Sequence, residues 1–121
     1  MKTSELTGAA LDWAVAIAEG FKPKQLYISR GSIYTRTFDD DGNPDGYTTG
    51  PDRLYSHKWE AGGPIIEREE ISLMYVCNWE AIIDGSDDMH VEHGDTPLIA
   101  AMRCYVASKL GDEVEIPKEL M

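Results

Sequence analysis

Apolar residues recur at helical spacing in two long stretches of the chain and one short one. The first stretch predicts a helix from Thr7 to about Glu19, with Thr7 as its cap. The last predicts a helix from Thr96 to Gly111, with Arg103 on its solvent side. Between them, Gly62-Gly63-Pro64 predicts the start of a short helix, because proline fits the first helical turn.

Two other stretches alternate apolar and polar residues with the period of a β-strand. Residues 26–38 predict one β-hairpin, and residues 71–83 predict a second that turns at Cys77-Asn78. The resulting order is α-β-β-α-β-β-α. We therefore expect one α+β domain over residues 1–121, in which a mainly antiparallel four-stranded sheet packs against two main helices and one short helix.

Acidic residues are concentrated between these elements. Residues 39–52 and 84–95 predict two acidic loops that contain no Lys or Arg, and residues 112–121 predict an acidic tail along a sheet edge. The chain has 22 Asp and Glu against 11 Lys and Arg, a net charge of -11. Such a surface repels phosphate and anionic lipid, so we expect neither direct nucleic acid binding nor membrane association.

The two cysteines, Cys77 and Cys104, are too few for a disulfide framework and favour a reducing compartment. No apolar run near the N-terminus has the form of a signal peptide. We expect a cytoplasmic protein.

Three segments of the chain resemble a known family. They are Leu6-Thr7-Gly8-Ala9-Ala10-Leu11-Asp12-Trp13-Ala14-Val15-Ala16, Trp59-Glu60-Ala61-Gly62-Gly63-Pro64-Ile65-Ile66-Glu67-Arg68-Glu69 and Thr96-Pro97-Leu98-Ile99-Ala100-Ala101-Met102-Arg103-Cys104-Tyr105-Val106-Ala107. In their residues and in their order along the chain, these segments resemble the NinX-like accessory proteins of lambdoid phages and enterobacterial prophages. The resemblance implies a phage or prophage origin and the cytoplasm of a bacterial host, and it implies no activity, cofactor or catalytic residue.

A small-ligand site is predicted around the double glycine. Gly62 and Gly63 before a helix would offer backbone amides to a phosphate, Tyr55 and Trp59 would stack on a ring, and Arg68 would add a positive charge. The alternative is a tight turn in which glycine lets two segments pack closely.

Two patterns are compatible with metal binding. Asp41, Asn43 and Asp45 followed by Gly46, with Asp52 at the twelfth position, have the spacing of a calcium loop, although the same residues form ordinary turns. His90 and His93 stand near acids and are compatible with zinc or with two solvated histidines. We predict no cofactor.

No nucleophile, phosphate-loop or metalloprotease motif is present, so we expect a binding protein rather than an enzyme. The first hypothesis is a phage factor that binds a host protein in takeover or counter-defence through acids of the predicted loop 84–95. Those acids are Asp84, Asp87, Asp88, Glu92 and Asp95. The alternatives are an oligomeric protein that binds or sequesters a small nucleotide signal, and an acidic mimic of DNA. A homo-oligomer is compatible with the predicted edge-like tail.

Overall fold

The computed structural model describes residues 1–48, 53–85 and 88–121. Its helices are α1 (Gly8–Ala18), α2 (Trp59–Arg68) and α3 (Pro97–Leu110), with 3-10 turns at Thr3–Glu5, Pro23–Gln25 and Lys118–Leu120. The first sheet consists of β1 (Leu26–Ser29), β2 (Ser32–Phe38) and β3 (Pro44–Tyr47), and the second of β4 (Ser72–Val76), β5 (Asn78–Asp84) and β6 (Met89–Gly94).

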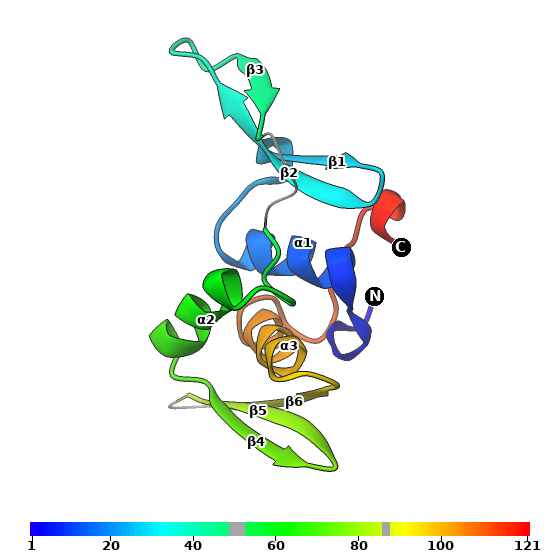
Figure 1. The fold of residues 1–121 in the computed structure, drawn as a ribbon, viewed down its shortest axis with the longest axis vertical. Coiled ribbons are helices and arrows are strands. Elements are labelled where there is room, and N and C mark those ends of the chain that lie inside the picture. The colour runs from blue at the N-terminus through cyan, green and yellow to red at the C-terminus, as the bar shows by residue number, and fades with distance from the viewer. Residues whose placement is uncertain (49–52, 86–87) are drawn as a thin grey trace.

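The α+β class is confirmed, but the single four-stranded sheet is wrong. Two separate three-stranded antiparallel sheets lie at opposite ends of the molecule, and the helices lie between them (Figure 1). The two unexpected strands, β3 and β6, occupy parts of the ranges 39–52 and 84–95 that were predicted as loops. The sequence of β3 contains proline, glycine and aspartate, which rarely form strands, and β6 is rich in polar residues. Both strands are stabilised by pairing with a neighbouring strand.

Helix α1 is buried at the centre of the molecule (Figure 1). Every residue from Ala10 to Ala16 is buried, because the first sheet packs on one side of the helix and α3 on another. Asp12 is the charged member of this buried run. The Thr7 side chain makes no capping hydrogen bond, contrary to the prediction, whereas the Thr96 hydroxyl accepts one from the Ile99 amide at 3.1 Å.

Each sheet turns one face toward the helices. In the first sheet, Leu26 and Ile33 are buried on the side of α1. In the second, α3 covers the face that carries Ala81, and the backbone of β6 comes very close to this helix. A Cβ placed on Gly94 would lie 2.7 Å from the Ala100 amide nitrogen, so only glycine permits this approach.

Side chains of α3 also hold the second sheet in place. Arg103 donates to the Leu6 carbonyl oxygen at 2.8 Å and to the His93 carbonyl oxygen at 2.7 Å, and the Cys104 thiol donates to the His90 carbonyl oxygen at 3.2 Å. The prediction of Arg103 as a solvated residue is therefore wrong. Burial lowers the pKa of Arg103 and raises the pKa of Cys104 to about 11.

The acidic tail does not extend either sheet. It forms an isolated bridge between Lys2 and Glu113, and the Met1 ammonium donates to the Val114 carbonyl oxygen at 2.9 Å. The β4–β5 hairpin turns at Cys77, which is exposed and has a φ of 68°. Within residues 1–48, 53–85 and 88–121, no helix is long and apolar enough to cross a membrane.

Candidate functional site

The residues of the predicted small-ligand site lie apart from one another in the structure. Trp59 begins α2 and Arg68 ends it, which places the two residues about 13 Å apart along the helix axis. Tyr55 is buried, so its ring is not available for stacking on a ligand. The structure therefore does not bring these three side chains into one site.

Gly62 and Gly63 lie inside α2 and not before it, so the predicted start of the helix at Pro64 is wrong. The Gly62 amide donates to the Lys58 carbonyl oxygen, as expected inside a helix, and is not offered to a phosphate. A Cβ on Gly62 would lie 2.5 Å from the Tyr55 carbonyl oxygen and 2.7 Å from Leu98 Cδ2. The close-packing interpretation of Gly62 is thus supported.

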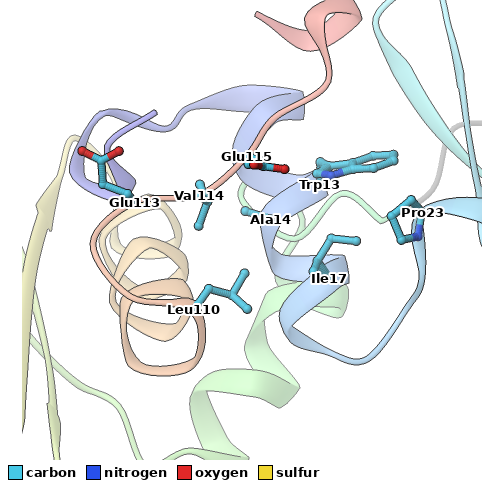
Figure 2. Close-up of a pocket in the computed structure, with 8 residues that line it drawn as sticks. All are labelled: Trp13, Ala14, Ile17, Pro23, Leu110, Glu113, Val114 and Glu115. Atoms are coloured by element: carbon cyan, nitrogen blue, oxygen red, sulfur yellow. The ribbon is translucent and has the colours of Figure 1, made fainter.

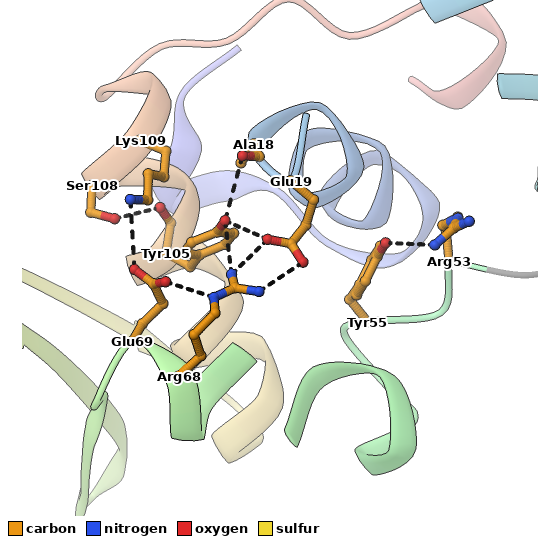
Figure 3. A network of polar contacts seen from close by, with 9 residues as sticks. All are labelled: Ala18, Glu19, Arg53, Tyr55, Arg68, Glu69, Tyr105, Ser108 and Lys109. Atoms are coloured by element: carbon orange, nitrogen blue, oxygen red, sulfur yellow. Dashed lines mark hydrogen bonds and ion pairs between the residues drawn. The ribbon is translucent and has the colours of Figure 1, made fainter. Parts of the chain in front are cut away.

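Arg68 belongs to a polar network that joins the ends of α1, α2 and α3 (Figure 3). Its guanidinium contacts Glu19 at 2.6 Å, Glu69 at 2.8 Å and the Tyr105 hydroxyl at 3.1 Å. Burial would raise the pKa of Glu19, but hydrogen bonds from Arg68 and Tyr105 outweigh it and lower that pKa. The network ties three helices together, and Arg68 is fully engaged within it.

A second polar cluster joins α1 to the segment before α2. The buried Asp12 carboxylate accepts the Ser56 amide at 2.8 Å, and its other oxygen lies 3.7 Å from His57 Nδ1. The Ser56 hydroxyl lies 3.5 Å from the same Nδ1. A nucleophilic triad uses the two ring nitrogens for different partners, whereas here both partners share one nitrogen at long distance. These contacts connect α1 to the segment before α2.

Two clefts flank the helices. One, of about 240 Å³, lies between Ser56, His57 and Trp59 and the first turn of α3, and Trp59 is 52% exposed there. The other, of about 290 Å³, lies between α1 and the tail (Figure 2). Ile17 faces Leu110 across it, and the Trp13 ring points toward Pro23. Sequence reasoning missed the second cleft because its walls come from opposite ends of the chain.

The acids predicted to bind a partner do not form one patch. Asp84 ends β5, Asp88 precedes β6 and Asp95 follows it, and all three are exposed. Glu92 is half-buried on the opposite side of β6, where it lines a small hollow with Lys2 and Asp112. Burial raises the pKa of Glu92. Asp87 lies outside the described residues.

The calcium-like pattern forms the turn between β2 and β3. The Asp39 carboxylate accepts the amides of Asp41 and Asn43, and Asp45 accepts the Thr37 hydroxyl at 2.6 Å. Asp52 lies outside the described residues. His90 and His93, three apart in one strand, point to opposite faces of the sheet. In the parts of the chain that the structure describes, no three His, Cys, Asp or Glu side chains gather as a metal site requires.

Sequence reasoning missed the outer face of the second sheet, the side turned away from α3. Strand alternation places one polar pair on it, His93 Nε2 at 3.0 Å from Glu80 Oε2. The apolar side chains on this outer face are Met74, Val76, Ile82, Met89 and Val91. Met74 is 52% exposed and Met89 64%. The signal was present as alternation through 72–76 and 89–93, but the acidic flanks concealed it.

The first sheet also carries an unexpected surface, which we call the tyrosine face. It consists of Tyr27, Tyr34, Arg36 and Tyr47, on the side turned away from α1. The rings of Tyr27 and Tyr47 stack with their centroids 4.6 Å apart, and Tyr34 meets Tyr47 edge-on at 5.6 Å. The Arg36 guanidinium carbon lies 5.1 Å from the centre of the Tyr27 ring. One cationic and three aromatic side chains thus share one surface, on which Tyr47 is exposed and the other three are half-buried.

Comparison with known proteins identifies one family. A family model described as Bacteriophage P22, NinX matches residues 2–109 of this chain, which confirms the resemblance found in the sequence. No curated protein matches the chain significantly. The matched range includes both sheets, α1, α2 and all of α3 except Leu110, and it ends before the tail that lines the cleft of Figure 2.

Proposed function

Because this chain belongs to the Bacteriophage P22 NinX family, we propose that it is a phage accessory protein that acts by binding a protein of the bacterial host. The observation that carries the proposal is the outer face of the second sheet. Met74, Val76, Met89 and Val91 are exposed on it, and an uncovered apolar surface otherwise favours aggregation. Surfaces of this kind are typical of protein interfaces.

The charges around this face indicate the kind of partner. Asp84 and Asp88 flank Met89 at one end, and Asp95 follows β6 at the other. Segment 71–95 contains no Lys or Arg. A partner that buries Met74 and Val91 and carries basic residues around its own apolar patch would be complementary in both respects.

A pull-down from host lysate with full-length protein tests the proposal. Replacing Met74 and Val91 together by Glu is expected to reduce recovery of a host protein at least about tenfold, because buried anchor residues dominate interface energies. Tyr34→Glu together with Tyr47→Glu adds the same two negative charges to the first sheet and is the matched control. If both variants recover equal amounts, the outer face is not the interface.

Light scattering on the purified protein separates a host partner from a second copy of the chain. If the outer face binds a host protein, the wild-type protein and the Met74→Glu, Val91→Glu double variant should have the same mass in solution. A dimer that the same double substitution converts to a monomer would contradict the proposal and assign the face to self-association.

A second candidate function is small-molecule binding beside Trp59. The half-exposed indole and His57 border a cleft of about 240 Å³, and aromatic walls are common in ligand pockets. Native mass spectrometry of protein purified from bacteria tests this function. A bound mass that disappears in Trp59→Ala supports it, and an apo mass under gentle conditions counts against it.

A further inference from the structure

We propose that the tyrosine face binds single-stranded nucleic acid, with bases stacked on its rings and phosphates held by cations around it. This inference concerns the first sheet and is independent of the host-protein interface proposed for the second. The strongly negative net charge of -11 argued against nucleic acid binding. That net charge, however, is an average over basic and acidic segments of the chain.

The aromatic side chains have the placement that base stacking requires. Tyr27, Tyr34 and Tyr47 come from three adjacent strands and meet on the side away from the core. Tyr47 is 52% exposed, and one side of its ring stacks on Tyr27. Every base has a π-face, so such a surface accepts single strands with little sequence preference.

The charge of β1, β2 and the segment before them favours an anion. Residues 20–38 contain four basic side chains and no Asp or Glu, on a chain whose net charge is -11. Lys22 and Lys24 stand immediately before β1, Arg30 lies in the β1–β2 turn, and Arg36 lies on the face itself. One cation thus lies on the face, and the other three lie at the two ends of β1, within reach of the phosphates of a strand bound there.

Nearby acids narrow the class of ligand. The carboxylates of Asp39, Asp40 and Asp41 lie at the tip of the β2–β3 hairpin, and Asp45 is held by the Thr37 hydroxyl at 2.6 Å. A duplex presents dense charge and hides its base faces, so it gains little from the rings and is repelled by the tip. A short single strand over β1 and β2 avoids both costs.

Fluorescence anisotropy with full-length protein and a labelled oligothymidine about 12 nucleotides long provides the test. We expect saturable binding at about 50 mM salt that weakens as salt increases. Tyr47→Ala is expected to weaken it at least about fivefold, and Tyr47→Phe, which keeps the ring, to leave it near the wild-type value. Arg36→Gln should reduce the salt dependence by about one phosphate contact.

Tyr75→Ala is the matched control, because Tyr75 is 62% exposed but lies on the acidic second sheet. It should leave the affinity unchanged, as should the double substitution at Met74 and Val91. Circular dichroism verifies that each variant is folded. Absence of saturable binding to the wild-type protein would overturn the proposal, as would equal losses in Tyr47→Ala and Tyr75→Ala, equal losses in Tyr47→Ala and Tyr47→Phe, or equally tight binding of the matching duplex.

Discussion

The two sheets share one architecture and present opposite chemistry. Each consists of three consecutive antiparallel strands with one face toward the helices (Figure 1). Segment 20–47, which includes β1 to β3, has four basic residues and four acids, the acids all within 39–45, whereas segment 71–95, which includes β4 to β6, has six acids and no Lys or Arg. The exposed face is aromatic in the first sheet and mainly aliphatic in the second. A net charge of -11 therefore does not describe the surroundings of either face.

The sheets also differ in how they are attached. The second is held to α3 by the close approach at Gly94 and by hydrogen bonds from Arg103 and Cys104. The first rests on α1 mainly through apolar side chains such as Leu26 and Ile33. Close backbone contact tolerates little change, whereas an apolar contact adapts, so the second sheet should be the more sensitive to small substitutions.

The largest expected effect tests that attachment. Gly94→Ala should lower the free energy of unfolding by about 3 kcal/mol, because the new Cβ meets the Ala100 nitrogen and Ile99. Urea unfolding measures it. In Gly63→Ala the new Cβ would lie 3.7 Å from the Trp59 ring, so this control should be neutral or stabilising. Similar losses in the two variants would mean that the close approach is not the cause.

The next effect concerns the hydrogen bonds from α3. Arg103→Met keeps most of the aliphatic length but leaves the Leu6 and His93 carbonyl oxygens without this donor, at a cost of about 2 kcal/mol. Thermal unfolding gives the value. Arg36→Met, on the first sheet, should change stability by much less than Arg103→Met. The contrast between the sheets fails if the two substitutions cost the same.

A smaller effect separates binding from stability on the tyrosine face. Tyr47→Ala removes one stacked and one edge-on ring contact at an exposed position, so we expect a loss of about 1 kcal/mol. Chemical denaturation measures it. A much larger loss would identify the three rings as a structural cluster that the first sheet needs in order to fold.

The smallest effect is a difference in pH dependence. Burial raises the pKa of Asp12 above its ordinary value of 3.8, although Ser56 and His57 act in the opposite direction. The folded state then holds the Asp12 proton more tightly than the unfolded chain, so this contribution to stability declines as pH rises above 3.8. Asp12→Asn should remove the decline and become relatively more stable toward neutral pH. Parallel stability curves for the two proteins would contradict it.

Glu19 has the opposite sign. Its pKa lies below the ordinary value of 4.5, so its contribution is present above that pH and is lost as pH falls through the folded pKa. Glu19→Gln should therefore flatten the acid side of the stability curve, which serves as an internal reference for Asp12→Asn.

Local patterns predicted the elements whose own residues favour them. The long helices at Gly8–Ala18 and Pro97–Leu110 and the hairpin around Cys77 agree with periodicity and turn chemistry. The start of α2 was misplaced because glycines and proline normally end helices, and here a tertiary contact at Gly62 outweighs that preference. Strands β3 and β6 depend on their partners, which periodicity cannot reveal.

The candidate sites depended even more on tertiary structure. Arg68 and Tyr55 were grouped with Trp59 by nearness in sequence, but helical geometry separates Arg68 and burial removes Tyr55. Tyr27 and Tyr47 are 20 positions apart and meet only through strand pairing. The absence of acids from 20–38 was readable in the sequence, yet its meaning emerges only when those residues occupy one sheet.

The hairpin apex has a practical consequence for finding the partner. Cys77 is exposed, whereas Cys104 is buried and burial raises its pKa to about 11, so a thiol reagent near neutral pH should modify Cys77 alone. A photo-crosslinker attached there would sit beside Val76, at the rim of the outer face of the second sheet. The unmodified sequence thus already contains a single attachment point for trapping whatever that face touches.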